Sequence, residues 1–372
     1  MGENANLLMF SWYDQIIWKL EGGENGMNRF LQLTGVNIPI IQAGMAGGIT
    51  TPELVAAVAN EGALGTIGAG YMNPESLRKT IQQIKQQTKK PFAVNVFATN
   101  LKAFSDDVSG MQAELNKFRE ELGITSGMDH VQTMDYLLEN IEVILEEKVP
   151  IVSTAFGLLS KEHILKLKAN QVILIGMATN VEEAKQLEAA GYDMIVAQGY
   201  EAGGHRGTFH MEKYPNGCDI GLVSLLASII EAVEVPVIAT GGIYSKEQIE
   251  GLLAMGAAAV QLGTRFLVAK EAGTADSYKD ALIKANDEDT VITKYFSGRP
   301  ARGIVNTFIK ELEQKQVPAM PFPIQNELTK DIRKVAQQQA NPQYQSLWAG
   351  QRVGSITREE TVSAIIQSLS NR

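Results

Sequence analysis

The 372-residue sequence contains only one cysteine, Cys218, so no disulfide bond can form within the chain. This thiol has no CxxC partner and no spacing typical of metal ligands, and we expect it to be an ordinary loop residue. A chain without disulfides suits a reducing compartment. Because no targeting segment is recognisable either, we expect a cytoplasmic location.

Histidine is also scarce, with four residues in the sequence. His163 falls in a helical pattern, while His130 and His210 fall in loops with no neighbour that would give them a chemical task. No cluster has metal-ligand spacing, and no serine or cysteine occupies a nucleophile elbow. We therefore expect no metal site and no nucleophilic serine or cysteine. His205 is the one histidine whose position suggests proton or anion chemistry.

Long apolar runs and long basic runs are absent as well. No apolar stretch approaches the roughly 18 residues of a membrane span. The 33 basic and 42 acidic residues give a net charge of −9 and are interspersed along the chain. This pattern predicts no nucleic-acid partner and no membrane association. The first 26 residues lack the basic start and cleavage site of a signal peptide.

A regular alternation of strands and helices is present instead. Apolar, β-branched runs of four to six residues each lead into a segment with helical periodicity. Four of the helices follow a capping residue, at Thr51, Asn73, Asn180 and Ser245. The predicted strands are Pro39–Gln42, Leu64–Ile67, Phe92–Val96, Ile151–Thr154, Val172–Gly176, Met194–Gln198, Val237–Thr240 and Ala259–Leu262.

Eight such units predict an α/β fold, a (β/α)8 TIM barrel. The alternative is a Rossmann-type sheet, which needs G-x-G-x-x-G after the first strand, and neither Gln42–Gly48 nor Gly68–Asn73 fits that pattern well. We place the barrel at residues 27–288, with an inserted segment at about 97–149 after strand 3. Residues 289–372 form a C-terminal helical appendage, in which Ser297–Gly303 is predicted as a loop.

The active site of such a barrel lies at the C-terminal ends of its strands. Strand seven ends in Thr240–Ile243 and strand eight in Gln261–Arg265, and the glycines in both turns precede helices. Paired turns of this kind predict a phosphate site. His205 follows Gly203 and Gly204 just past the sixth strand, so we expect it to face the barrel mouth beside a phosphate-bearing ligand.

Several of these segments together resemble the nitronate monooxygenase family, formerly called 2-nitropropane dioxygenases. The most specific string is Gln-Gly-Tyr-Glu-Ala-Gly-Gly-His-Arg-Gly at residues 198–207, and the resemblance extends from about Met27 to the C-terminus. One departure is Gly44, where the family often has proline. The other matching segments are Pro39–Ala46, Ala93–Phe97, Thr240–Ile243, Gln261–Thr264 and Ser297–Arg299.

The resemblance implies that FMN is bound non-covalently. Its phosphate would lie against Gly242, Gly263 and Thr264, in agreement with the phosphate site inferred from the two turns. His205 matches the family's active-site histidine. The residues implied to bind FMN are Asn95, Gln198, Gly203, Gly242, Gln261, Leu262, Gly263 and Thr264.

The reaction implied by the resemblance is the oxidation of an alkyl nitronate, such as propionate 3-nitronate, by O₂ to a carbonyl compound and nitrite. His205 would hold the nitronate anion or take the α-proton of a neutral nitroalkane. The alternative is an NAD(P)H-dependent flavin reductase. The enoyl-acyl-carrier-protein reductases and NADH:quinone reductases on this fold share the Glu-Ala-Gly-Gly-His string.

The expected partners are therefore a small-molecule nitronate and O₂, and homo-oligomer formation is left open. The first 26 residues fall outside the resemblance. Two interpretations remain for them, an upstream start with Met27 as the natural first residue, or a docking segment.

Overall fold

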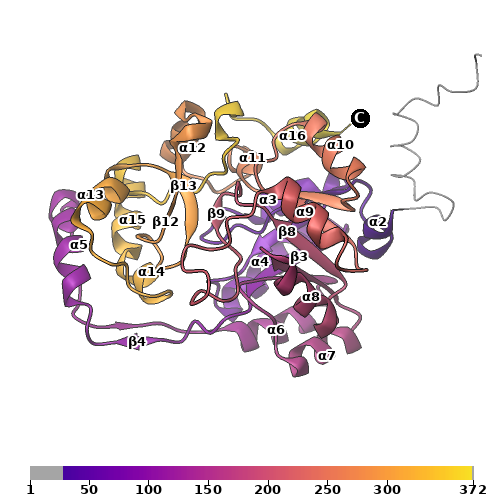
Figure 1. The fold of residues 1–372 in the computed structure, drawn as a ribbon, viewed down its shortest axis with the longest axis horizontal. Coiled ribbons are helices and arrows are strands. Elements are labelled where there is room, and N and C mark those ends of the chain that lie inside the picture. The colour runs from indigo at the N-terminus through magenta and orange to yellow at the C-terminus, as the bar shows by residue number, and fades with distance from the viewer. Residues whose placement is uncertain (1–27, 371–372) are drawn as a thin grey trace, which may run out of the picture.

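The structure, a computed structural model, describes residues 28–370 (Figure 1). The N-terminal 26 residues, with the two interpretations given for them, lie outside the described residues.

Eight parallel strands form the centre of the fold. Their order is β1-β11-β10-β8-β7-β6-β3-β2. The two ends of this order meet, because Leu64 N donates to Ile40 O and Gln42 N donates to Leu64 O, both at 2.9 Å. The sheet is thus a closed barrel, and the predicted TIM barrel is confirmed. The strands are β1 (Ile40–Gln42), β2 (Gly65–Gly68), β3 (Phe92–Phe97), β6 (Ile151–Ala155), β7 (Ile173–Ala178), β8 (Met194–Gln198), β10 (Val237–Thr240) and β11 (Ala259–Leu262).

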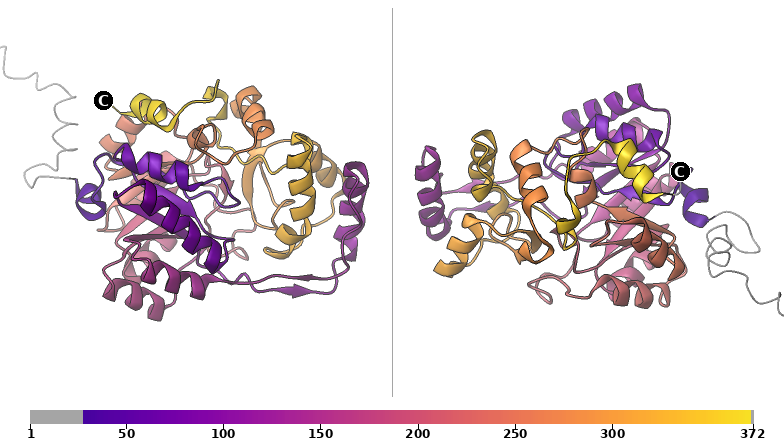
Figure 2. Two further views of the ribbon diagram at one scale, coloured as in Figure 1. Left: turned by 180° about the vertical axis from the view of Figure 1, so that it is seen from behind. Right: turned by 90° about the horizontal axis from the view of Figure 1, so that it is seen from above.

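Amphipathic helices cover the outside of the barrel. The side chains of Thr51, Asn73, Asn180 and Ser245 each accept a hydrogen bond from a backbone N–H in the first turn, as the sequence predicted. The last helix packs against α3 and α10 on the barrel (Figure 2). The covering helices are α3 (Pro52–Asn60), α4 (Pro74–Gln87), α6 (Leu137–Glu146), α7 (Lys161–Ala169), α8 (Val181–Ala190), α9 (Leu222–Ile230), α10 (Lys246–Ala254), α11 (Thr264–Leu267) and α16 (Val362–Leu369).

The barrel interior is filled by side chains and closed at its N-terminal end. Ile41, Ile175 and Ile238 from three strands pack with Phe30 of α2 (Arg29–Thr34), and all four are buried. This packing leaves the opposite end, at the carboxyl termini of the strands, as the open mouth. No helix among residues 28–370 is long and apolar enough to cross a bilayer.

The chain between β3 and α6 forms an arm that reaches away from the barrel. It contains α5 (Ser109–Leu122) and the two-stranded antiparallel pair of β4 (Phe104–Ser105) and β5 (Val131–Gln132). Both views in Figure 2 show α5 against the C-terminal helices rather than the barrel. α6 is one of the helices that cover the barrel. The segment between the end of β3 and the start of α6 therefore comprises residues 98–136.

The C-terminal part of the chain builds a second layer over the barrel mouth. β12 (Thr290–Thr293), β13 (Ala301–Ile304) and β9 (Gly204–His205) form a three-stranded antiparallel sheet. The prediction of a loop at residues 297–303 is therefore wrong for its second half, because Ala301 and Arg302 pair with His205 and Gly204. Arginine and glycine give no strand signal, and the segment is extended because it pairs with β12 and β9.

The remaining helices complete this layer beside the arm (Figure 1). Phe118 of α5 lies 5.0 Å from Phe308 between ring centroids, within a second hydrophobic cluster. Buried Arg119 pairs with Asp331 at 2.8 Å, which ties the arm to the C-terminal layer. The helices are α12 (Asp276–Lys284), α13 (Thr307–Lys315), α14 (Ile324–Leu328) and α15 (Lys330–Gln338), with short 3-10 turns at Asp287–Asp289, Pro342–Tyr344 and Val353–Ser355.

Candidate active site

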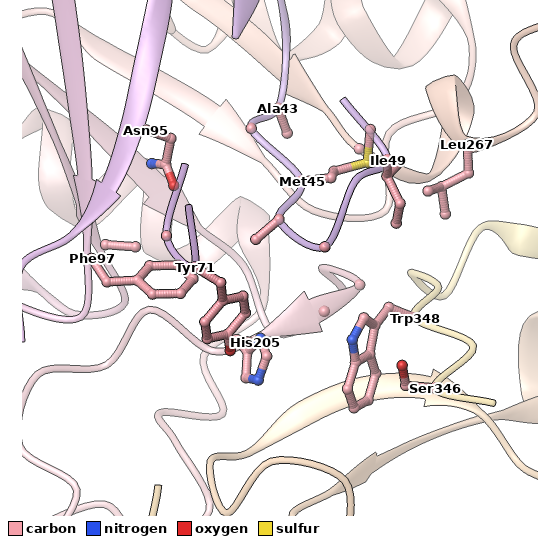
Figure 3. Close-up of a pocket in the computed structure, with 18 of the residues that line it drawn as sticks. Ala43, Met45, Ile49, Tyr71, Asn95, Phe97, His205, Leu267, Ser346 and Trp348 are labelled. Carbon is pink, nitrogen blue, oxygen red and sulfur yellow. The ribbon is translucent and has the colours of Figure 1, made fainter. Parts of the chain in front are cut away.

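A cavity of about 740 Å³ lies between the barrel mouth and the C-terminal layer. Its barrel side is formed by the ends of the strands and the loops that follow them, and its other side by α14, α15 and the segment around Trp348. His205 and Trp348 are among the lining residues drawn in Figure 3. All the site residues predicted from the sequence line this cavity: Asn95, Gln198, Gly203, His205, Gly242, Gln261, Leu262, Gly263 and Thr264.

Glycines let three backbone segments meet at one end of the cavity. A Cβ on Gly203 would lie 2.5 Å from Gly350 N, so the loop after β8 touches the C-terminal segment directly. Gly350 N in turn donates to Thr264 Oγ1 at 3.0 Å, beside Gly263. Gly242 has a φ of +64°, a conformation that favours glycine. The result is a cradle in which a ligand can approach the backbone closely.

Asn95 is fixed at the opposite edge of the cradle by its amide nitrogen. Nδ2 donates to Ser153 Oγ at 2.9 Å, and Oδ1 has no hydrogen-bond partner among residues 28–370. The side chain points into the cavity (Figure 3). Gly44 packs against it, since a Cβ there would lie 2.6 Å from Asn95 Cβ. The glycine found where the family often has proline thus allows the β1 loop to lie against Asn95.

Gln198 holds the loop that carries the histidine. Its Nε2 donates to His205 O at 3.0 Å, and its Oε1 accepts from Gly207 N at 2.8 Å. The sequence predicted Gln198 as a cofactor contact. It lines the cavity, but its amide also fixes the backbone on both sides of Arg206, a task that spacing along the chain could not reveal.

Two buried arginines fix the same loop through backbone carbonyls. Arg206 donates to Gly199 O at 2.6 Å and to Gln198 O at 3.0 Å. Arg299 donates to Arg206 O at 3.3 Å and lies 4.0 Å from the centroid of the Phe156 ring. Neither arginine lines the cavity, so their contribution is to position the loop and to add positive potential behind it.

His205 projects from β9 into the cavity among aromatic side chains (Figure 3). Its ring centroid is 5.5 Å from that of Trp348 and 5.8 Å from that of Phe156. Burial lowers the pKa of His205 to about 3, and the positive charges of Arg299 and Arg333 act in the same direction. The imidazole is therefore neutral at physiological pH.

The hydrogen bonds of Ser297 identify the protonated nitrogen of this imidazole. Ser297 Oγ lies 2.8 Å from His205 Nε2, 3.1 Å from Arg299 O and 3.3 Å from Arg299 N. A hydroxyl has a single proton, and Arg299 O can only accept, so Ser297 donates to that carbonyl and accepts from the other two atoms. This assignment places the proton of His205 on Nε2 and leaves Nδ1 as a lone-pair acceptor.

The lowered pKa of His205 predicts how stability changes with pH. Between its ordinary pKa of 6.5 and about 3, the unfolded chain binds a proton that the folded chain does not, so stability falls as the pH drops through this window. From pH 7 to pH 5 we expect the wild type to lose about 1–2 kcal/mol more unfolding free energy than His205→Asn. Urea unfolding at both pH values measures this difference, and equal losses in the two proteins would contradict it.

An eight-stranded barrel with a glycine-lined cradle and a half-buried histidine at its mouth defines a barrel enzyme with a ligand-binding site. Residues 29–372 match the family model described as nitronate monooxygenase. The chain belongs to this family and is an oxidoreductase.

Individual relatives agree with this assignment. The chain is 42% identical over 325 residues to a probable nitronate monooxygenase of Staphylococcus aureus (strain Newman), a match that covers 87% of this chain and 91% of the relative. Among solved structures, nitroalkane oxidase from Streptomyces ansochromogenes has a TM-score of 0.84 and 36% identity, covering 91% of this chain and 96% of that one. FabK from Thermotoga maritima has a TM-score of 0.73 and 29% identity, covering 92% and 94%.

Proposed function

We propose that this protein is an FMN-dependent nitronate monooxygenase that oxidises alkyl nitronates with O₂ to a carbonyl compound and nitrite. The observation that carries the proposal is a neutral His205 that faces the cavity next to the glycine cradle, with the cations Arg299 and Arg333 close enough to lower its pKa. A neutral base in a positive potential suits a small organic anion or a carbon acid that becomes one.

The residues present fit FMN. Gly203 and Gly242 let the backbone pack closely beside the cavity, and the phosphate would lie against Gly242, Gly263 and Thr264. Asn95 Oδ1 offers an unused acceptor to a ring N–H. Gln198, Gln261 and Leu262 line the same end of the cavity. When bound there, the flavin supplies the electron acceptor that no side chain of the protein provides.

The protein's own side chains orient the substrate beside His205 and exclude water from the reacting carbon. His205 Nδ1, unprotonated, takes the α-proton of a neutral nitroalkane, or turns toward the carbon end of a nitronate whose oxygens face the positive potential of Arg299. Trp348 and Phe156 surround the imidazole and limit the access of water to the reacting carbon. Tyr278 holds the Trp348 backbone by donating its hydroxyl hydrogen to Trp348 O.

A second candidate is an NAD(P)H-dependent flavin reductase. The likeness to FabK, at 29% identity over 92% of this chain, favours it.

Anaerobic mixing separates these two candidates. We expect the purified holoenzyme to be yellow and its flavin to bleach rapidly with propionate 3-nitronate, because the nitronate itself supplies the electrons. NADH and NADPH should bleach it only slowly. Rapid bleaching by a nicotinamide and none by the nitronate would transfer the assignment to the reductases, and a colourless protein that FMN cannot reconstitute would contradict the cofactor.

A further inference from the structure

The cavity continues beyond His205 along one face of α15, opposite the barrel mouth. We propose that Arg333 forms an anion subsite on this face and binds a carboxylate at the far end of the substrate. The inference deepens the proposed function and rests on it, because it assigns the residue that holds the carboxylate of a substrate such as propionate 3-nitronate.

The subsite lies on a single helical face. Lys330, Arg333, Lys334 and Gln337 are spaced i, i+3, i+4 and i+7, which brings them to the same side of α15, and all four line the cavity. The barrel-side residues of the cradle and His205 line the other wall. A ligand with its reacting end beside His205 therefore directs its other end toward this face.

Arg333 is held in place without being neutralised. Its Nε donates to Thr329 O at 3.3 Å, and its Nη2 donates to Asn326 O at 2.7 Å and to Asn326 Oδ1 at 3.0 Å. These bonds fix the plane of the guanidinium and leave Nη1 without a partner among residues 28–370. A fixed planar donor group needs little further ordering to bind an oxyanion.

The acidic side chains nearby have other partners. Glu327 pairs with Lys330 at 3.1 Å, and Asp331 pairs with Arg119 at 2.8 Å. Asp135, on the facing wall, accepts from the backbone N–H of Leu101 at 3.2 Å and of Leu137 at 3.0 Å. No carboxylate lies within ion-pair distance of Arg333 in the described part of the chain.

The positive charge of Arg333 reaches the reacting end of the cavity. It lowers the pKa of His205 and opposes the rise that burial causes in the pKa of Tyr71, which lines the same cavity. An enclosed cation without a counter-ion is unfavourable, and a bound carboxylate removes that penalty. The charge is therefore more consistent with a ligand-binding role than with stabilisation of the fold.

Arg333→Gln tests the subsite with two nitronates. Propionate 3-nitronate has a carboxylate at its far end, and butyl 1-nitronate does not. We expect kcat/KM for propionate 3-nitronate to fall by about 10- to 100-fold, which is the usual contribution of a charged hydrogen bond. Most of this loss should come from a higher KM. For butyl 1-nitronate the change should stay below about threefold, and Arg333→Lys should recover part of the loss. Arg78→Gln, on the outer helix α4 where Arg78 pairs with Glu146, is the matched control and should change neither value.

Two kinetic outcomes would overturn the subsite. Equal losses with both nitronates would mean that Arg333 acts on the reacting end or on the fold, and unchanged values with both would mean that it binds nothing.

Equilibrium binding provides a test that does not depend on turnover. Succinate has the same chain of four atoms joining two anionic ends as propionate 3-nitronate. When succinate is titrated into the oxidised holoenzyme, it should bind at least about tenfold more weakly to Arg333→Gln than to the wild type, and Arg78→Gln should bind it as the wild type does. If nitronates fail to reduce the flavin but this succinate difference is found, the proposed function fails and the subsite stands. If the affinity for NADH depends on Arg333 and that for succinate does not, the anion is a phosphate and the carboxylate assignment is wrong.

Discussion

His205→Asn should lower kcat for propionate 3-nitronate by at least about 100-fold while the protein still purifies with FMN. General-base catalysis and charge placement by a histidine contribute about 10²- to 10⁴-fold. Asparagine keeps a polar group near Ser297, but it is shorter than histidine and has no basic nitrogen to replace His205 Nδ1. The cradle is formed by backbone around Gly203, Gly242 and Thr264, which the substitution does not touch.

Steady-state kinetics and the ratio of flavin to protein absorbance measure the two parts of this prediction. His163→Asn is the matched control, because His163 lies half-buried in the first turn of α7 and does not line the cavity. Its kcat should equal that of the wild type. Turnover of His205→Asn within about twofold of wild type would remove this histidine from the mechanism.

The barrel could be predicted from the sequence because its strands are locally encoded. Met194–Gln198, Val237–Thr240 and Ala259–Leu262 are short apolar runs buried on both faces, and each was predicted with the bounds that the structure has. The small antiparallel sheet was missed for the opposite reason. β9 has two residues and β13 contains Arg302 and Gly303, so pairing across the fold, not local preference, makes these segments strands.

The residues of the candidate site also fall into those that could be predicted from the sequence and those that could not. The glycine turns and His205 stand next to predicted strand ends, so their place at the barrel mouth followed from chain order. Trp348 and Arg333 reach the cavity, and Ser297 reaches His205, from positions more than 80 residues beyond His205 along the chain. Only the packing of the C-terminal layer brings them there. A signal existed for one of them, since Ser297 begins the Ser-Gly-Arg match to the family.

Gly203→Ala should weaken FMN binding by at least about 10- to 100-fold. The added Cβ would lie 2.5 Å from Gly350 N and 2.6 Å from Ala349 C, and these are backbone atoms that no change of side-chain rotamer can move away. Overpacking of this kind costs about 1–3 kcal/mol. The strain falls on the contact between the loop after β8 and the C-terminal segment whose Gly350 N donates to Thr264 Oγ1. These two parts of the cradle must therefore move apart.

Measuring FMN dissociation by fluorescence in reconstituted protein tests this prediction, with Gly251→Ala as the control. Gly251 lies inside α10, where a Cβ meets nothing within 4 Å, and alanine there favours the helix. Gly251→Ala should therefore bind FMN as the wild type does. If Gly203→Ala also binds FMN with wild-type affinity, FMN binding does not depend on the contact between Gly203 and Gly350. The cradle that the C-terminal segment completes is then not the flavin phosphate site. If only Gly203→Ala loses FMN while its circular dichroism spectrum is unchanged, the C-terminal layer both covers the barrel mouth and forms part of the cofactor site.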